Sequence, residues 1–193
     1  MTQAEFISSV KTKKPEAFFN DHIMVEESKY IKSDQIEFIK NTIATRMSIN
    51  ITDINIIIAG SSKLEYSLYE KRENGRVLPK YRPFSIFTSD IDVAVISTKL
   101  FEKCWDALSN YACLQPTMPW DGDELSDYLL SGWIRPEKLP DLFFYRMWWD
   151  CFGFLSRQPR LEKLKVRGCL YYKFDYFKNY QIRSITNCVR RYQ

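Results

Sequence analysis

Hydrophobic positions in this chain follow two periods, one typical of helices and one typical of strands. Residues 1–32 are polar to mixed in character. Ile36, Ile39 and Ile43 then recur at helical spacing, and Asp34 with Glu37 three residues later forms a capping-box pattern just before them. The pattern therefore predicts a helix that begins near residue 33 and packs one face on the core.

Two apolar segments flank a long polar stretch in the middle of the chain. Residues 54–59 are mainly β-branched and predict a strand buried on both faces. Residues 90–96 alternate and predict a second strand. Between them we expect a short helix over 63–71, and the Asn-Gly and proline positions of residues 72–86 indicate a loop or a hairpin-like excursion.

The remainder of the chain contains helical and strand-like patterns without an internal repeat or a linker. The predicted elements are a helix over 100–114 ended by Pro116 and Pro119, helical turns over 123–130 and 142–155, a strand over 165–173, and a closing helix over 174–192. We therefore expect residues 1–193 to form a single α+β domain.

Composition places the chain among ordinary globular proteins. It has 193 residues, 45% apolar and 27% charged, which suits one well-buried domain. The 16% aromatic content is high, and all five tryptophans lie in the second half, which predicts an aromatic core or a surface that a protein partner covers. The net charge of +4 permits a polyanionic partner without arguing for one.

Cysteine usage and hydropathy give an expected location. The five cysteines are odd in number and form no C-x-x-C pair, so we expect reduced thiols. The first residues lack the pattern of a secretory signal, and no apolar run approaches the roughly 18 residues of a membrane span. A cytoplasmic protein without a membrane partner is expected.

The turn after the first strand has the composition of a phosphate site. Gly60 would let a phosphate approach the backbone, the Ser61 hydroxyl can donate a hydrogen bond, and the start of a helix offers free N–H groups. A Gly-Ser turn alone more often serves only to reverse the chain. A second feature is needed to distinguish these interpretations.

The second strand supplies that feature, because it begins with Asp90 and Asp92. Side chains alternate along a strand, so both aspartates project from one face while Ile91 and Val93 enter the core. Cα atoms two residues apart are separated by roughly 6.6 Å, which lets two carboxylates hold divalent cations such as Mg²⁺. A hydrated face of an edge strand is the alternative, and the preceding Gly-Ser turn favours the metal site.

An apolar strand, Gly-Ser, a helix and then Ser-Asp-x-Asp on an apolar strand resemble the catalytic core of the nucleotidyltransferase superfamily. This superfamily includes DNA polymerase beta, minimal nucleotidyltransferases of toxin-antitoxin modules, and cyclic-oligonucleotide synthases of phage defence. The resemblance covers about residues 34–114 and leaves 115–193 as an aromatic strand-helix region. It implies a polymerase beta-like α+β fold with a mixed sheet flanked by helices.

The resemblance also implies nucleotide-binding roles at the turn. Gly60 and Ser61 would hold the β- and γ-phosphates of a nucleoside triphosphate, and the neighbouring Ser62 and Lys63 would add contacts to the triphosphate.

The same resemblance makes Asp90 and Asp92 the catalytic residues and the metal ligands, for Mg²⁺ or Mn²⁺. A nucleoside monophosphate would pass to a hydroxyl acceptor as pyrophosphate leaves, while the metals lower the pKa of the attacking hydroxyl and stabilise the departing oxygen. The acceptor stays open among RNA, a protein side chain and a small molecule such as a nucleotide.

The resulting expectation is a small Mg²⁺-dependent nucleotidyltransferase in a bacterial toxin-antitoxin or phage-defence context, because the chain lacks room for the helical second domain of larger members. The alternative is a catalytically degenerate nucleotide-binding or scaffold subunit of the same fold. Such a subunit would act through a protein partner that covers its aromatic C-terminal half.

Two features depart from the superfamily pattern. The interval between the Gly-Ser turn and Asp90 is about twice the usual one, so residues 69–88 are expected to form an insertion near the site, as an acceptor-binding element, a lid or a plain loop. The superfamily also places a third carboxylate on a later strand, but residues 165–173 contain no acidic residue. Asp141, Asp150 and Asp175 would serve only if that strand is assigned wrongly.

Other chemistry-bearing residues receive simpler interpretations. His22 is the only histidine, which excludes a two-histidine metal site and favours a structural role. The acidic residues of 121–127 are expected to form a solvated helix start, and the aromatic residues of 143–154 to form core rather than a base-stacking surface. Basic residues near the C-terminus, namely Lys178, Arg183, Arg190 and Arg191, can track phosphates or simply suit a helix end.

Overall fold

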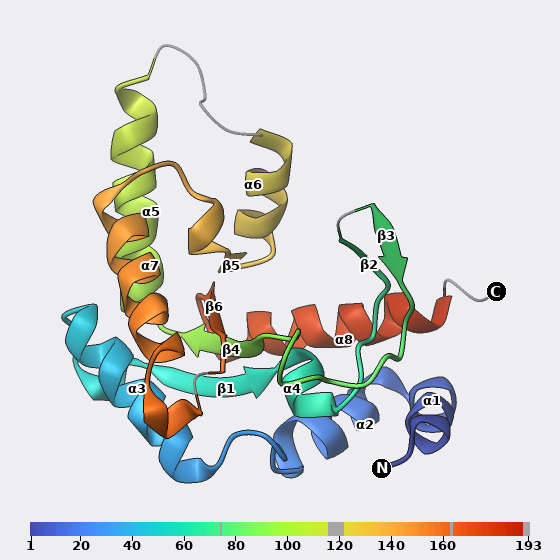
Figure 1. Cartoon of the computed structure of the whole chain (residues 1–193). Helices are drawn as coiled ribbons and strands as arrows, with labels where there is room; N and C mark the ends of the chain where they lie inside the picture. Colours follow the sequence, from blue (N-terminus) through green and yellow to red (C-terminus); the bar gives the residue numbers. More distant parts are fainter. Residues whose placement is uncertain (74, 116–121, 163, 191–193) are drawn as a thin grey trace.

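The computed structural model describes residues 1–73, 75–115, 122–162 and 164–190. Within this part of the chain, the centre of the fold is a four-stranded mixed sheet with the strand order β1 (Asn55–Ala59), β4 (Ile91–Ile96), β6 (Val166–Tyr171) and β5 (Trp133–Ile134) (Figure 1). β4 pairs antiparallel with β1 and parallel with β6, and β5 pairs antiparallel with β6. The expected α+β class with a mixed sheet is confirmed.

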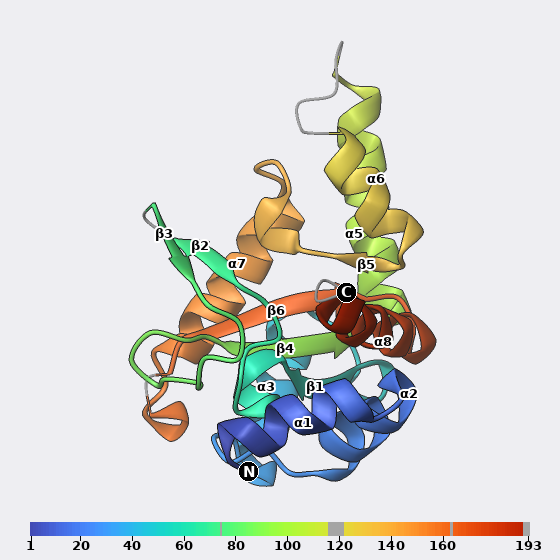
Figure 2. The same cartoon turned by 90° about the vertical axis from the view of Figure 1, so that its right-hand side faces the viewer.

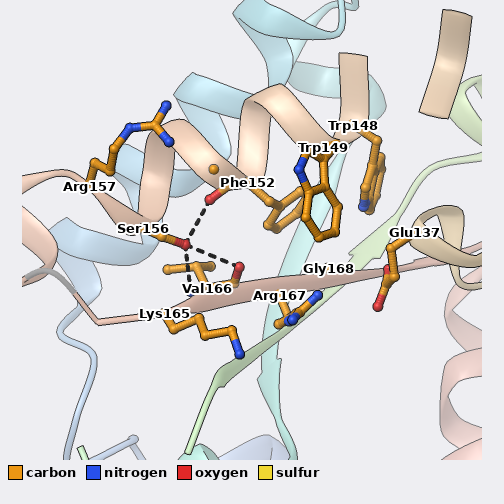
Figure 3. A pocket seen from close by; sticks show the side chains of 11 residues that line it. Glu137, Trp148, Trp149, Phe152, Ser156, Arg157, Lys165, Val166, Arg167 and Gly168 are labelled. Atoms are coloured by element: carbon orange, nitrogen blue, oxygen red, sulfur yellow. Dashed lines mark hydrogen bonds between the residues drawn. The ribbon is translucent and has the colours of Figure 1, made fainter. Parts of the chain in front are cut away.

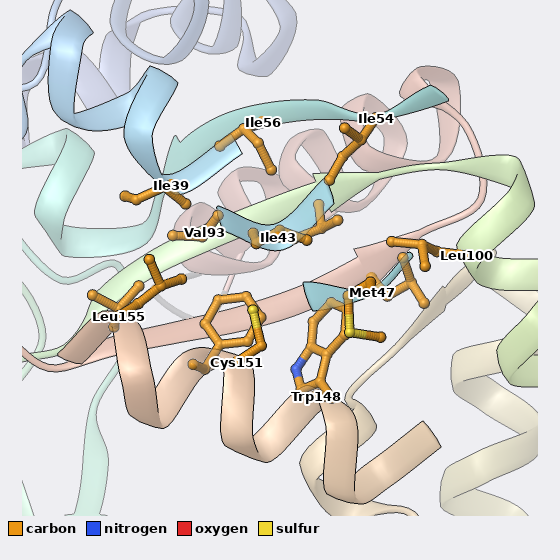
Figure 4. Close-up of a cluster of buried hydrophobic side chains, with 14 of the residues drawn as sticks. Ile39, Ile43, Met47, Ile54, Ile56, Val93, Leu100, Trp148, Cys151 and Leu155 are labelled. Carbon is orange, nitrogen blue, oxygen red and sulfur yellow. The ribbon is translucent and has the colours of Figure 1, made fainter. Parts of the chain in front are cut away.

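One face of the sheet is covered by α3 (Ser33–Arg46), α5 (Thr98–Cys113) and α7 (Phe143–Ser156). Alternation along β4 directs its odd-numbered apolar side chains to this face. Figure 4 shows the resulting cluster, in which side chains of the helices meet those of the strands. Its labelled members are Ile39, Ile43, Met47, Ile54, Ile56, Val93, Leu100, Trp148, Cys151 and Leu155.

The helix predicted from Ile39 and Ile43 is therefore present, and it begins at Ser33 as expected. Its predicted capping by Asp34 and Glu37 is wrong. The side chain of Gln35 instead accepts a hydrogen bond from the backbone N–H of Lys32, at 2.9 Å.

The opposite face is covered by α8 (Phe174–Arg190) and by the N-terminal α1 (Gln3–Thr12), α2 (Pro15–Phe18) and π-helix η1 (Phe19–Val25) (Figure 2). Phe6, Phe18, Phe19 and Phe177 are almost completely buried there. The N-terminal segment, which looked polar to mixed from its sequence, thus completes the second half of the core.

The stretch between β1 and β4 contains the short helix α4 (Gly60–Leu64) and a hairpin of β2 (Lys71–Glu73) and β3 (Arg76–Leu78). The hairpin projects away from the sheet (Figures 1 and 2) and confirms the predicted excursion. The helix predicted over 63–71 begins earlier and ends at Leu64, because Glu65 adopts a left-handed conformation with φ of 68°.

The second half follows the predicted order, with additions that the pattern did not indicate. The predicted strand over 165–173 corresponds to β6, and α5, α7 and α8 match their predictions closely at the ends that the structure describes. The predicted helical turns over 123–130 correspond to α6 (Gly122–Leu130). The strand β5 and the 3₁₀ turns η3 (Pro136–Lys138) and η4 (Pro159–Leu161) were not predicted, nor was η2 (Ile51–Asp53) in the first half. Pro116, Pro119, Asp121 and Arg191, on which some predictions rest, lie outside the described residues.

The aromatic helix α7 only partly fulfils its prediction as core. Phe144, Trp148 and Cys151 are buried, but Phe143 is 78% exposed and Trp149 is 50% exposed. All five cysteines are free thiols, in agreement with the sequence. Among the described residues, the structure contains no helix that is both long enough and apolar enough to cross a membrane.

Candidate functional site

The predicted phosphate turn and the second predicted aspartate are in direct contact. Strand pairing places Ala59 opposite Asp92, so Gly60 comes next to the Asp92 side chain. A Cβ atom at Gly60 would lie 2.1 Å from Oδ2 of Asp92, and Gly60 has a φ of 61°. Only glycine suits this position, because it permits both the backbone conformation and the close approach of the carboxylate.

The residues after Gly60 have different environments. Ser61 is partly exposed, whereas Ser62 is completely buried. The Ser62 hydroxyl donates to the Ala59 carbonyl at 2.8 Å and accepts from the Asp92 backbone N–H at 3.3 Å. Ser62 therefore ties the turn to β4, and its side chain is not open to a phosphate as the sequence prediction required.

Lys63 also differs from its predicted role. Its Nζ donates to the backbone carbonyl of Glu26, at the end of η1. Burial is the main influence on this amine and lowers the pKa of Lys63. The ammonium group thus holds the N-terminal segment against the turn, which leaves Gly60 and Ser61 as the accessible part of the predicted cradle.

Asp92 is a desolvated acid. Burial, followed by the nearby charge of Asp90, raises the pKa of Asp92 to about 7. Arg135 and Lys71 act on it in the opposite direction, but neither forms a salt bridge with it in the described part of the chain. A bound cation would remove much of this cost, because an opposite charge favours the ionised carboxylate.

Asp90 has the opposite environment, because two cations hold it. Lys165 Nζ lies 3.1 Å from Oδ1 of Asp90 and Arg167 Nε lies 3.3 Å from Oδ2. The Asp90 side chain remains 27% exposed. The sequence indicated that basic residues occupy this strand, but only the parallel pairing of β4 with β6 shows that they reach Asp90.

The position expected to hold a third carboxylate contains an arginine. Arg167 is the register partner of Asp92 on β6, and the assignment of this strand is correct. Asp141 pairs with Arg146 at 2.6 Å, and Asp150 and Asp175 are exposed. Among the described residues there is no group of three or more histidine, cysteine, aspartate or glutamate side chains that could hold a metal ion.

Two further charged residues near Asp92 were not found from the sequence. Arg135 and Glu137 follow β5 and form a salt bridge of 3.2 Å. Both charges act on Asp92, Arg135 lowering and Glu137 raising its pKa. Their proximity depends on the pairing of β5 with β6, and a strand of two residues gives almost no periodic signal in the sequence.

A cavity of about 310 Å³ lies beside β6, and we call it the β6 cavity (Figure 3). Side chains of α7 form one wall, the start of β6 forms the other, and Glu137 stands at one end. Arg167 and Lys165 line the cavity as well as contacting Asp90. The lining residues are Glu137, Trp148, Trp149, Phe152, Gly153, Ser156, Arg157, Lys165, Val166, Arg167 and Gly168.

His22 has the structural role that the sequence favoured. Its Nδ1 lies 2.9 Å from Glu26 Oε1, and its Nε2 lies 2.9 Å from the Ser9 hydroxyl. These contacts join η1 to α1 within the N-terminal segment.

Asp92 fits a divalent cation, because it is a desolvated carboxylate without an ion-pair partner in the described structure. Asp90 fits as a second ligand if it leaves Lys165 and Arg167. Comparison of the chain with protein-family models, with curated proteins and with solved structures finds no match.

Proposed function

We propose that this chain is a nucleotidyltransferase that uses Mg²⁺ or Mn²⁺ to transfer a nucleoside monophosphate from a nucleoside triphosphate to a hydroxyl. The observation that carries the proposal is the contact between Gly60 and the Asp92 carboxylate. It joins the Gly60 turn, whose backbone a phosphate can approach, to a desolvated acid that forms no salt bridge with any residue the structure describes, although the charges of Arg135 and Lys71 lower its pKa. This is the juxtaposition that the sequence resemblance requires.

The accessible residues of the turn would bind phosphate, and the two aspartates would bind the metal ion. Gly60 would admit phosphate oxygens close to the backbone, and the Ser61 hydroxyl would donate to them. Asp92 and Asp90 would hold the divalent cation, which when bound supplies positive charge to the attacking and leaving oxygens. The chain itself positions the triphosphate against the acceptor, and such positioning accounts for much of the barrier reduction in phosphoryl transfer.

The ion pairs of Asp90 do not prevent this role. Partly exposed pairs of this kind contribute only about 0–1 kcal/mol, so a divalent cation can replace Lys165 and Arg167 at low cost. Both side chains would then be available for phosphate oxygens, and the guanidinium of Arg167 can bind a phosphate in a bidentate manner. A cation at this position would oppose the negative charge that develops on the departing pyrophosphate.

A second candidate is nucleotide binding without turnover. The observation that favours it is Arg167 at the position where the superfamily has a third carboxylate. Without that acid, the acceptor hydroxyl loses one group that could help to remove its proton. The toxin-antitoxin or phage-defence context stays a prediction for either candidate.

A labelling experiment distinguishes the two candidates. The purified chain is incubated with each α-labelled nucleoside triphosphate, Mg²⁺ or Mn²⁺, and RNA, nucleotide or protein acceptors, and pyrophosphate release and label transfer are measured. Asp92→Ala should abolish both, whereas Asp106→Ala, which changes an exposed aspartate on α5, should leave both unchanged. Triphosphate binding without turnover supports the second candidate, and the absence of any triphosphate binding contradicts both.

A further inference from the structure

The β6 cavity combines aromatic and cationic walls. Trp149 is half exposed, and Phe152 and Trp148 complete the aromatic side of the cavity. Three cationic side chains, Arg157, Lys165 and Arg167, line it, and Glu137 is the one acid among its described lining residues. Glu137 pairs with Arg135, and Lys165 and Arg167 share the single charge of Asp90. The cavity therefore has an excess of positive charge beside an aromatic surface, which suits a ligand that has a ring and an anionic group.

Gly168 of β6 lines the same cavity. The Ile91 N–H donates to the Lys165 carbonyl. In a parallel pair the backbone N–H and C=O groups alternate in direction, so those of the odd-numbered residues of β6 point toward β4 and those of the even-numbered residues point away from it. Of these even residues, Val166 is bound by the Ser156 hydroxyl and Leu170 pairs with β5. Gly168 lies between them and lines the cavity, where no strand of the described structure covers it.

Gly168 is buried and packs against the Phe152 ring, so the aromatic and cationic side chains are the groups that the cavity offers to a ligand. The volume of about 310 Å³ lies at the lower end of the range typical of small-molecule sites. The aromatic wall suits a base and the cationic wall suits a phosphate, and together they indicate a nucleotide rather than an amino-acid side chain.

We propose that the β6 cavity binds the acceptor of the transfer reaction and that this acceptor is a nucleotide, either free or at the end of an RNA chain. The base lies against the α7 aromatic side chains, and its phosphate contacts Lys165, Arg167 and Arg157. The assignment as acceptor rests on the proposed function, whereas the binding itself does not.

Occupancy of the cavity should also change the metal site, because the two sites share Lys165 and Arg167. A phosphate that takes these cations leaves Asp90 with its negative charge uncompensated. The carboxylate then attracts a divalent cation more strongly. Ligand and metal thus favour each other, and the coupling must be reciprocal.

The test begins with the binding of nucleoside monophosphates in the presence of EDTA, measured by isothermal titration calorimetry. AMP, GMP, CMP and UMP are compared with their nucleosides and with inorganic phosphate. At least one monophosphate should bind about tenfold more tightly than either part alone, because ring and phosphate contacts contribute together. A 5′-phosphorylated trinucleotide then distinguishes an RNA end, which binds more tightly than the monophosphate, from a free nucleotide, which does not.

Matched variants locate the site. Arg157→Ala and Trp149→Leu should each weaken monophosphate binding about fivefold or more. Arg183→Ala, at an exposed arginine on α8, and Trp105→Leu, at a tryptophan that is 46% exposed on α5, should not. The binding monophosphate should also raise the affinity for Mn²⁺ about threefold or more.

The outcomes separate this inference from the proposed function. If Gly60→Ala removes monophosphate binding and Trp149→Leu does not, the nucleotide sits at the Gly-Ser turn, and the inference is overturned while the transferase proposal survives. Absence of monophosphate binding also overturns it. Binding that depends on Arg157 and Trp149, in a protein without transferase activity, supports the cavity assignment and contradicts the proposed reaction.

Discussion

The charged surroundings of the candidate site differ between the two sides of β4. Toward β1, the Asp92 carboxylate lies against Gly60 and forms no salt bridge with the residues that the structure describes, although the charges of Arg135 and Lys71 lower its pKa. Toward β6, Asp90 is held by Lys165 and Arg167. Asp92 is in register with Ala59 on β1 and with Arg167 on β6, whereas Asp90, which directly precedes β4, forms ion pairs with Lys165 and Arg167. Two aspartates two residues apart thus have different electrostatic surroundings.

The comparison shows that a two-carboxylate motif does not by itself define a metal site. On the β1 side, the structure places Gly60 in contact with the desolvated carboxylate of Asp92, while Ser62 and Lys63 make contacts within the chain. The β6 side has positive charge where the sequence resemblance led us to expect a third acid. A metal ion at Asp90 must therefore displace Lys165 and Arg167. A phosphate that binds these two side chains would make the displacement easier.

The largest effect is expected from adding a methyl group on the β1 side. Gly60→Ala should lower triphosphate binding about 100-fold and the free energy of unfolding by about 1–3 kcal/mol, because the new Cβ would collide with the Asp92 carboxylate. Gly75→Ala is the matched control, since Gly75 also has a positive φ but has no neighbour within 4 Å of an added Cβ. Equal effects of the two substitutions would show that backbone strain, and not the contact with Asp92, explains the loss.

The next effect concerns the pH dependence of stability. A folded-state pKa of about 7 for Asp92, above the usual 3.8, means that the folded chain binds this proton more tightly than the unfolded chain does. The free energy of unfolding should therefore fall as the pH rises from about 4 to about 7 and then level off. Asp92→Asn should be more stable than the original chain by about 1–3 kcal/mol at pH 8, with a smaller difference at pH 5.

Chemical denaturation at the two pH values measures this difference. Asp90→Asn is the control on the other side of β4. It removes two ion pairs and should not increase the free energy of unfolding at either pH. A stabilisation by Asp90→Asn equal to that by Asp92→Asn would remove the proposed contrast.

A charge reversal tests the β6 side directly. Arg167→Asp should raise the affinity for Mn²⁺ about tenfold, because it frees Asp90 from one cation and supplies a third carboxylate beside Asp92. Arg167→Ala should give only the part of the increase that comes from releasing Asp90. Metal titration monitored by Mn²⁺ electron paramagnetic resonance would measure both, and no gain from the aspartate over the alanine would argue against a shared metal site.

The smallest effect is expected from Lys165→Gln. This change removes the second cation of Asp90 and should raise the affinity for Mn²⁺ about two- to threefold at low salt, because the ion pair is partly exposed and weak. The increase should shrink at high salt, where charges on the surface are screened. Lys99→Gln, which breaks an ion pair with Asp53, should not change Mn²⁺ affinity at any salt concentration.

Much of the fold could be predicted because strong periodic patterns reflect burial. Ile39 and Ile43 identified α3, and the alternation after Asp92 identified β4. The N-terminal helices gave a weak signal, because the polar residues 11–14 separate Phe6 and Val10 from Phe18 and Phe19. β5 was missed since two residues are too short for a period.

The candidate site could be predicted only on the side where the signal is local. Gly60 and Asp92 were identified from a turn motif and a strand that follows it, and their contact depends on one antiparallel pairing. The burial of Ser62 and the bond from Lys63 to Glu26 could not be inferred, because both depend on how an N-terminal segment packs against the turn. The sequence showed that residues 165 and 167 are basic, but it did not show that both pair with Asp90.

The sequence by itself determined which residues alternate toward the core, where the glycine turn stands, and that Asp90 and Asp92 stand two residues apart where β4 begins, because these properties are local to one strand and the turn before it. Tertiary structure alone decided which charges meet across strands. The parallel register of β4 with β6 brings Arg167 beside Asp92 and, with Lys165, within reach of Asp90, although 77 residues separate Asp90 from Arg167 in the chain. Electrostatic energy depends on distance in space, and the order of residues along the chain does not fix that distance.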